Sequence, residues 1–218
     1  MTYCTLECTS PIDWDKLIYS KINEYLDGIE EQVSVLDIGA NIGSFITNVG
    51  ILPKIKNIYG IEPDKTNFNL LQQNIQRANI SNVKLLNYAV SDKVEEVNIY
   101  SGNGTCETFN ILNSNNNEHI RSRVKSVTLD FLSNKLQQTF DVIKIDVEGA
   151  ETKVIIGGIN TIKNCKRVFL EIHNNTTFIE ILKIVNEQKW KIKCLKNNHL
   201  INQKDSKIDF CYQVIIQP

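Results

Sequence analysis

The stretch that decides the fold spans residues 33–43 and reads Val33-Ser34-Val35-Leu36-Asp37-Ile38-Gly39-Ala40-Asn41-Ile42-Gly43. Its first half is a β-branched run that ends in a glycine turn, which predicts a strand over residues 33–38. The next segment places Phe45, Ile46 and Val49 on one face and stops near Pro53, which predicts a short helix. Together they indicate one strand–turn–helix unit of an α/β fold.

The same alternation continues along the chain. We expect further strands at residues 55–61, 83–90, 140–145, 167–172, 191–195 and 210–216, and helices at residues 11–29, 65–78, 150–162 and 177–185. Asp64 and Thr177 are the expected N-caps of two of these helices. Strands that alternate with helices across short connections predict a parallel sheet with helices on both faces, and the last two strands can pair as an antiparallel hairpin. The fold class is therefore a doubly wound α/β domain over residues 1–218, with an N-terminal helical segment at residues 1–32.

One stretch, residues 94–126, breaks this rhythm because two possible strands flank a segment rich in glycine and asparagine. Loops of this length inside a compact domain are either lids over a site or surface insertions, and the residues leave both interpretations open. Candidates for contact with an acceptor molecule lie in or beside it, namely Tyr100, Phe109, His119, Arg121 and Arg123.

The composition is that of a globular protein with a sizeable core, because 42% of the 218 residues are hydrophobic and 22% are charged. Lys+Arg 24 against Asp+Glu 25 leaves a net charge of −1, which disfavours a dedicated nucleic-acid binder. No stretch reads as a signal peptide or a membrane span, so we expect a cytoplasmic protein without a membrane partner. The cysteines are scattered, and we expect reduced, structural thiols.

Ligands of open α/β sheets bind beyond the carboxyl ends of the strands, near the point where the strand order reverses. In the loop after the first strand, Gly39 permits a tight turn and Gly43 permits close approach of the helix. Asn41 stands where a dinucleotide fingerprint has its middle glycine, and Asp37 would repel phosphate but favour an ammonium group. Both features disfavour NAD; the alternative for Asp37 is a helix cap.

The second strand ends at Glu62, which the following Pro63 holds extended. A carboxylate at this place can accept both hydroxyls of a ribose, so the two strand ends together favour a nucleoside site. The alternative for Glu62 is a solvated strand end.

Ionisable side chains follow the fourth and fifth strands. Asp146 lies at the end of one and Glu148 and Glu151 come directly after it, where capping of a helix is the simpler interpretation for the two glutamates. Glu171 and His173 alternate onto one face at the end of the other strand. A histidine beside acids at a ligand-binding edge is a candidate general base.

These segments together resemble the FkbM-type branch of the class I methyltransferases that depend on S-adenosylmethionine (SAM). The matching motifs are Val35-Leu36-Asp37-Ile38-Gly39-Ala40-Asn41-Ile42-Gly43, Gly60-Ile61-Glu62-Pro63, Val127-Thr128-Leu129-Asp130, Ile143-Lys144-Ile145-Asp146-Val147-Glu148-Gly149-Ala150-Glu151 and Leu170-Glu171-Ile172-His173. The block from Lys144 to Glu151 is the most specific of them. The resemblance runs from about Val33 to the C-terminus and leaves out residues 1–32 and 94–126.

The resemblance implies a Rossmann-like, mostly parallel sheet of seven strands with an antiparallel last strand, and SAM as the cofactor. It implies that the glycine loop holds the methionine portion, that Glu62 binds the ribose and that residues 89–92 flank the adenine. The cofactor-binding set is then Asp37, Gly39, Ala40, Asn41, Gly43, Glu62, Pro63, Ala89, Val90 and Asp146. Members of the family typically methylate hydroxyl groups of sugars, polyketides or other metabolites, so the expected partner is a small hydroxyl compound.

Methyl transfer requires the acceptor oxygen to be aligned with the donor and to lose its proton. We expect His173 or Asp146 to take that proton, with Glu171 orienting the imidazole. A competing hypothesis is that Asp146, Glu148 and Glu171 bind a divalent cation that activates the hydroxyl. An RNA or protein methyltransferase, an NAD-dependent enzyme and a catalytically silent binding module remain as alternative functions. The sequence predicts neither the acceptor nor the oligomeric state.

Overall fold

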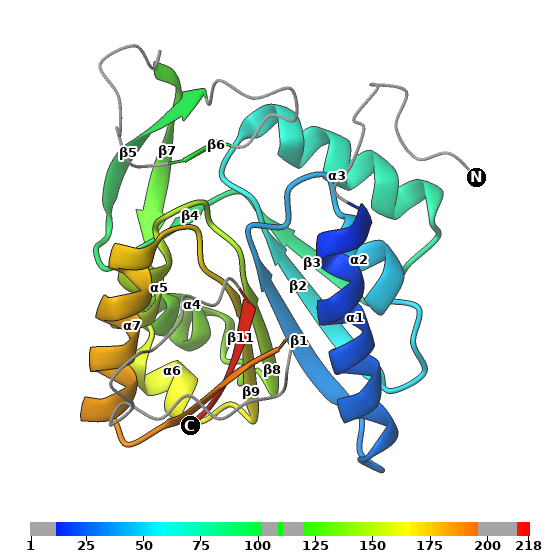
Figure 1. Cartoon of the computed structure of the whole chain (residues 1–218). Coiled ribbons are helices and arrows are strands. Elements are labelled where there is room, and N and C mark those ends of the chain that lie inside the picture. The colour runs from blue at the N-terminus through cyan, green and yellow to red at the C-terminus, as the bar shows by residue number, and fades with distance from the viewer. Residues whose placement is uncertain (1–11, 102–108, 111–119, 196–212) are drawn as a thin grey trace.

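The structure is a computed structural model that describes residues 12–101, 109–110, 120–195 and 213–218. Its main sheet has the strand order β10-β11-β9-β8-β1-β2-β3, and β11 is antiparallel to both of its neighbours (Figure 1). The strands are β1 (Val33–Ile38), β2 (Ile55–Ile61), β3 (Val83–Leu86), β8 (Val142–Ile145), β9 (Arg167–Glu171), β10 (Lys191–Cys194) and β11 (Gln213–Gln217). The predicted sheet of seven strands with an antiparallel last strand is confirmed.

The strand order reverses at β1. This strand pairs in parallel with β2 on one side and with β8 on the other, and β8 pairs with β9. In these pairs Ile38 aligns with both Ile61 and Ile145, and Ile145 aligns with Leu170. The carboxyl ends of the four strands therefore meet at one edge, which is where a ligand of such a sheet binds.

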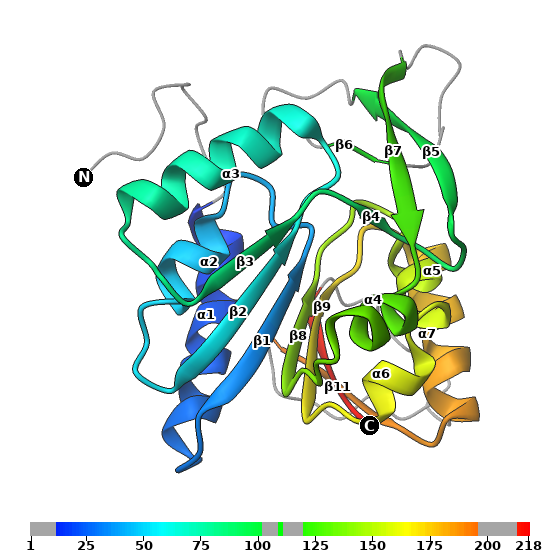
Figure 2. The ribbon, with the colours of Figure 1, turned by 180° about the vertical axis from the view of Figure 1, so that it is seen from behind.

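Helices cover both faces of the main sheet, as Figures 1 and 2 show from opposite sides. One face carries α1 (Ile12–Asp27), α2 (Ser44–Val49) and α3 (Lys65–Arg77), and the other carries α4 (Leu129–Leu136), α5 (Glu151–Ile156), α6 (Ile159–Lys163) and α7 (Asn175–Glu187). Alternation along β1 explains the two layers, because Val35 packs in the apolar cluster of α1–α3 and Leu36 in that of α4–α7.

The predicted third strand is wrong as a single element. It divides into β3 and β4 (Ala89–Val90), and β4 belongs to a second sheet. At the division, the side-chain amide of Asn87 donates to the carbonyl oxygens of Glu62 and Pro63, which ties the chain to the end of β2. This contact between distant segments has no pattern in the local sequence.

Residues 94–126 are built around paired strands rather than an open loop. The second sheet has the order β4-β7-β5-β6 and adds β5 (Glu95–Ser101), β6 (Phe109–Asn110) and β7 (Ile120–Val127) to β4. Figure 1 shows it beyond the end of the main sheet at which β1 and β2 finish. Residues 102–108 and 111–119 lie outside the described residues, so a lid stays a prediction.

The helices differ from the sequence predictions at three places. The helix α4, which the sequence pattern did not predict, begins after Thr128, whose hydroxyl accepts from the amide of Phe131. The helix expected at residues 150–162 breaks at Gly157 and Gly158, where added Cβ atoms would lie 2.2 Å from the carbonyl oxygen of Ser91 and 2.6 Å from Leu129. The α7 helix starts before Thr177.

The cap of α7 is Asn174, whose side chain accepts from the amide of Thr177, so the predicted cap lies three residues too late. The predicted cap Asp64 is confirmed, because its carboxylate accepts from the amides of Thr66 and Asn67. Asn174 lies three residues after the end of β9 and directly after His173, so α7 begins immediately beyond the site residues of this strand end.

The two cysteines in the described part of the chain are in different states. Cys165 is a free, buried thiol, as expected. Cys194 forms a disulfide whose other cysteine is outside the described part of the chain, so the expectation of reduced thiols is wrong at that position. Among the helices of the described residues, none has the length and apolar character needed to cross a membrane.

Candidate functional site

The loop after β1 is tied closely to the neighbouring strand ends. The amides of Gly39 and Ala40 donate to the carbonyl oxygen of Ile61, at the end of β2. Gly39 has φ +85°, and an added Cβ would lie 1.7 Å from the carbonyl oxygen of Asp146. Only glycine fits this position, which brings the loop against the end of β8.

Glu62 is buried at the end of β2, with 5% of its surface exposed. Its Oε2 accepts from the amide of Asn41 and its Oε1 from the amide of Asp64, both at 2.9 Å. Burial raises the pKa of Glu62 to about 7, although these two amide donors lower it. The interpretation of Glu62 as a solvated strand end is therefore wrong.

A pocket opens between the ends of β1, β2, β4 and β8. Of the expected cofactor-binding residues, those that line it are Gly39, Asn41, Glu62, Pro63, Ala89, Val90 and Asp146. The other residues of its lining are Ile38, Ile61, Asn67, Tyr88, Val147, Glu148 and Ala150.

The remaining expected cofactor residues lie behind the pocket. Asp37 and Ala40 are buried, and an added Cβ at Gly43 would lie 2.5 Å from Leu71 of α3. Gly43 thus permits helix packing, as expected for its residue type. Asp37 has a partner within the chain, because its Oδ1 lies 3.3 Å from Nζ of Lys144.

Lys144 lies between Asp37 of β1 and Asp146 of the pocket wall. It is 3% exposed, and its Nζ also lies 3.3 Å from Oδ2 of Asp146. The ammonium group of Lys144 therefore gives Asp37 a counter-charge within the chain. Its contact with Asp146 also places that side chain at the pocket wall.

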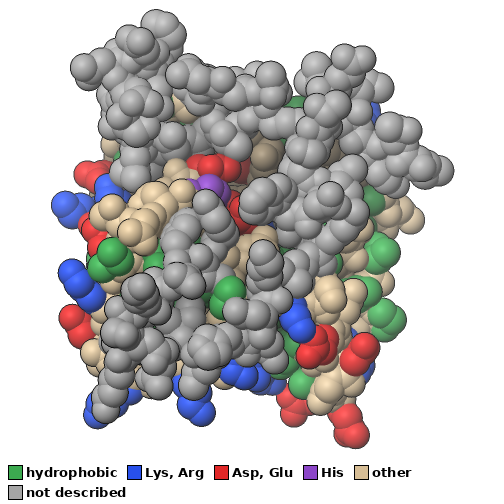
Figure 3. Space-filling view, in the orientation of Figure 1, with side chains coloured by type: hydrophobic (Ala, Val, Ile, Leu, Met, Phe, Trp, Pro, Cys, Tyr) green, Lys and Arg blue, Asp and Glu red, His purple; other side chains and the backbone are tan. Residues whose placement is uncertain are grey.

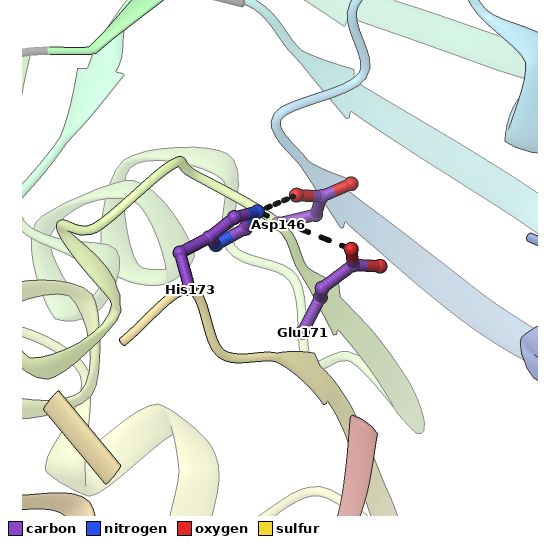
Figure 4. Close-up of side chains that lie close together, drawn as sticks. All are labelled: Asp146, Glu171 and His173. Carbon is purple, nitrogen blue, oxygen red and sulfur yellow. Dashed lines mark ion pairs between the residues drawn. The ribbon is translucent and has the colours of Figure 1, made fainter. Parts of the chain in front are cut away.

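Carboxylates and an imidazole converge at the ends of β8 and β9 (Figure 4). Nε2 of His173 lies 3.2 Å from Glu148 Oε2, 3.6 Å from Asp146 Oδ1 and 3.9 Å from Glu171 Oε1. Nδ1 of His173 lies 2.7 Å from Oε1 of Glu151. We call these five residues the carboxylate–imidazole cluster. In the space-filling view, acidic side chains gather beside a histidine (Figure 3).

The imidazole is oriented by Glu151 rather than by Glu171. Glu151 is fully buried, and its Oε1 also accepts from the amide of Gly149 at 2.8 Å. It thus holds the turn after β8, as a cap would, and the ring of His173 at the same time. The preceding Glu148 has φ +53° and Gly149 has φ +102°, a left-handed turn that brings the Glu148 side chain back to the cluster.

The surroundings shift the protonation of the cluster. Burial raises the pKa of Glu171 to about 7, and the charge of Asp146 raises it further. Burial also raises the pKa of Glu148. For His173, burial lowers the pKa, but the hydrogen bond to Glu151 and the charge of Glu148 outweigh it and raise the pKa to about 9. Glu148 and Glu171 therefore bind a proton more readily than exposed carboxyls do, and His173 carries a proton at neutral pH.

A known protein family matches most of this chain. The family described as "Methyltransferase FkbM domain" matches residues 37–209. The chain belongs to this family. The resemblance seen in the sequence is thereby confirmed, and the chain is an FkbM-family methyltransferase.

A relative agrees with this assignment, and two solved structures share the fold. The FkbM-family chain is 29% identical to hexuronic acid methyltransferase AglP of Haloferax volcanii over 79% of this chain and 70% of that protein. A ribosomal protein L11 methylase of Lactobacillus delbrueckii subsp. bulgaricus superposes with a TM-score of 0.53 at 12% identity, over 95% of this chain and 78% of that one. A Streptococcus mutans protein in complex with SAH superposes with a TM-score of 0.50 at 10% identity, over 96% of this chain and 98% of that one. At such identities, the two structures support the Rossmann-like methyltransferase fold alone.

Lys144 and Glu151 are the residues of the FkbM-family site whose contacts the sequence did not indicate. Both stand in the motif that links β8 to α5, and a charged residue inside a buried strand was the available hint for Lys144. For Glu151 the helix-capping pattern concealed the contact with His173, which lies 22 residues further along the chain.

Among the candidates for acceptor contact, Tyr100 is half-buried on β5 and Arg123 is exposed on β7. His119 and the side chains of Phe109 and Arg121 lie outside the described part of the chain.

Proposed function

We propose that this FkbM-family methyltransferase transfers a methyl group from SAM to a hydroxyl group of a sugar. One observation carries the proposal: Asp146 and Glu148 belong both to the pocket wall and to the carboxylate–imidazole cluster. A molecule in the pocket would thus end beside groups that can accept a proton. The name of the Haloferax volcanii relative supports a uronic acid as the sugar.

The pocket suits SAM on its own geometry. Each oxygen of Glu62 already accepts one backbone amide and retains a second acceptor position for a ribose hydroxyl. Ala89, Val90 and Pro63 offer apolar contacts for a flat base. Gly39 leaves bare backbone where a Cβ would meet the end of β8. When bound, SAM supplies a methyl group on a positively charged sulfur, which keeps the bonding electron pair when the methyl group leaves.

Proton removal is assigned to the cluster. A new bond between the acceptor oxygen and the methyl carbon requires the hydroxyl proton to leave, and the sequence suggests His173 or Asp146 as the group that takes it. His173 can take it only in its deprotonated form, because its pKa is raised to about 9. In support, Glu151 holds Nδ1 of His173 so that Nε2 faces Asp146 and Glu148. Glu171 is 3.9 Å from Nε2 and contributes charge rather than orientation.

A carboxylate on the acceptor has candidate partners on β7. Arg123 and Lys125 are both exposed, and in the pairing with β5 they lie opposite Asn98 and Glu96. Alternation puts these side chains on the solvent face of the second sheet, since Val124 and Ser126 point to its packed face. The role of Arg123 in binding a uronic acid is part of the proposal.

Calorimetry with S-adenosylhomocysteine (SAH) and with NAD tests the cofactor. We expect SAH to bind to one site per chain. NAD should release no heat, because the side chain of Asn41 stands where the pyrophosphate of NAD needs the bare backbone of a glycine. A screen of sugars and uronic acids for SAH release then tests the acceptor, with Arg123→Ala expected to raise KM for the acids more than for neutral sugars. NAD binding without SAH binding would contradict the proposal, as would SAH binding without turnover on any hydroxyl compound.

His173→Ala and Asp146→Ala separate the two candidates for the proton acceptor. The variant that lacks the acceptor is expected to lose about 10²–10⁴-fold in kcat while it still binds SAH. A variant with unchanged turnover removes that residue from the role.

A further inference from the structure

Three side chains of the cluster present one atom each to a common centre. Asp146, Glu171 and His173 can each offer a ligand atom such that the three atoms lie within 4.8 Å of one another. Figure 4 shows the three side chains converging from the ends of β8 and β9. Nε2 of the ring lies 3.6 Å from Oδ1 of Asp146 and 3.9 Å from Oε1 of Glu171. These distances place the three atoms around a small volume.

The other polar atom of each of these side chains is held from behind. Oδ2 of Asp146 lies 3.3 Å from Nζ of Lys144, and Oε2 of Glu171 accepts from the amide of Gln213 at 3.4 Å. Nδ1 of His173 lies 2.7 Å from Oε1 of Glu151. Partners of this kind orient the ligands of metal sites, and a carboxylate on the far nitrogen is the usual partner of a metal-binding histidine.

The charge of the site also favours binding of a cation. Glu151 is fully buried, and its Oε2 has no hydrogen-bond partner among the described residues. Glu151 contacts the far side of the His173 ring. The carboxylates of Asp146, Glu148 and Glu171 lie nearby, and their cationic neighbours are Lys144 and His173. A divalent ion between the inward atoms would offset this excess of negative charge.

We propose that Asp146, Glu171 and His173 bind a divalent cation of the Mn²⁺ type beside the pocket, whose wall includes Asp146. Two carboxylate oxygens with one imidazole nitrogen suit manganese, because carboxylates favour hard divalent ions and imidazole favours transition metals. The sequence suggests Asp146, Glu148 and Glu171 as the ligands of a cation. In the structure, the third ligand beside Asp146 and Glu171 is His173 and not Glu148. Glu148 lies 3.2 Å from Nε2 and competes for the ring when no cation is present.

The role of the cation, unlike its binding, rests on the proposed function. A divalent ion beside the acceptor would orient its hydroxyl and lower the pKa of that hydroxyl. The cation and a transferred proton exclude each other at Nε2 of His173, because both need the same lone pair. A cation-loaded enzyme therefore uses His173 as a ligand and not as a base.

Titration of the chelator-stripped chain of 218 residues with Mn²⁺ alone tests the site, with free Mn²⁺ followed by electron paramagnetic resonance. We expect saturable binding of one ion per chain in the wild type. Glu171→Gln and Asp146→Asn are expected to weaken binding at least tenfold, and Gln213→Leu about tenfold because it releases Glu171. The exposed Glu180→Gln on α7 is the matched control and should bind as the wild type does. Magnetic coupling of Mn²⁺ to an imidazole nitrogen should be present in the wild type and absent in His173→Gln.

Thermal unfolding of each variant, and its calorimetric titration with SAH, distinguish a lost ligand from a lost fold. Absence of saturable Mn²⁺ binding overturns the inference, and so does binding that Glu171→Gln leaves unchanged in a folded variant. If SAH binds and methyl transfer continues in excess chelator, the catalytic role of the cation is wrong and the proposed function stands. If Mn²⁺ binds and SAH does not, the cation site stands and the proposed function fails.

Discussion

Buried charged side chains define the site at the scale of single residues. Lys144 lies between Asp37 and Asp146, and its burial means that neither carboxylate relies on solvent for a counter-charge. Glu151 plays a similar part for His173. Removing one partner of such a buried pair costs more than a surface ion pair contributes, because the other charge is left without compensation.

Glu62 gives a prediction for the pH dependence of stability. Its pKa is about 7 in the folded chain and 4.5 is its ordinary value, so the folded state binds the proton more tightly than the unfolded state does. The contribution of Glu62 to stability is therefore most favourable below pH 4.5 and is lost as the pH rises through 7, by an amount on the order of 3 kcal/mol. Urea unfolding at pH 5 and pH 8 measures it.

Glu62→Gln should reduce the difference in unfolding free energy between pH 5 and pH 8, since the amide does not titrate. Glu180→Gln, which replaces an exposed carboxyl on α7, should leave that difference as in the wild type. An equal pH dependence in the wild type and in Glu62→Gln would show that Glu62 keeps its ordinary pKa.

The turns that follow strands position the site at the scale of elements. Gly39 turns the loop after β1 against the end of β8, and Glu148 with Gly149 turns the chain between β8 and α5. Each turn uses left-handed backbone, which costs little for glycine and more for other residues. The strands end at one edge of the main sheet. The turns then bring the backbone of Gly39 and the side chain of Glu148 to that edge.

Gly39→Ala is expected to disturb the pocket by two effects. The residue has φ +85°, and its added Cβ would meet the carbonyl oxygen of Asp146 at 1.7 Å. Loop and strand end must separate, so we expect a lower melting temperature and at least about tenfold weaker SAH binding, corresponding to 1.4 kcal/mol or more. Gly28→Ala is the control, because its Cβ would have no neighbour closer than 3.6 Å. SAH binding by Gly39→Ala equal to that of the wild type would contradict the tight fit of this loop.

At the scale of the whole molecule, the main sheet separates two apolar clusters. The cluster on one side includes Ile18, Ile22 and Leu26 of α1 together with residues of β1, β2, α2 and α3. Although α1 lies outside the family resemblance, it therefore covers part of the sheet core. We infer that residues 12–27 belong to the same folding unit as the sheet.

Ile22→Ala tests that inference. Ile22 is fully buried, and its truncation is expected to reduce the free energy of unfolding by about 2–5 kcal/mol in a single cooperative transition. Asn23→Ala changes the exposed neighbour on the same helix and should have little effect. A separate early transition in Ile22→Ala, with the main transition unchanged, would mean that α1 unfolds independently.

The sequence predicted those parts of the fold and site that depend on local patterns. Asp64 was found as a cap because a cap acts on amides two and three residues away. The break at Gly157 and Gly158 was missed because its cause is close contact with Ser91 and Leu129, far away in the sequence. The same reason explains the division of the third strand, where Asn87 bonds to the end of β2.

By itself, the sequence determined the α/β class, the glycine loop and the strand ends that carry Asp146, Glu171 and His173. Alternating strands and helices force parallel pairing, and parallel pairing brings carboxyl ends to one edge. Only the tertiary structure decided which atoms face one another. Lys144, Gln213 and Glu151 come from different elements, and their hydrogen bonds depend on side-chain packing that no periodic pattern encodes. Those contacts orient the side chains of Asp146, Glu171 and His173 toward one another.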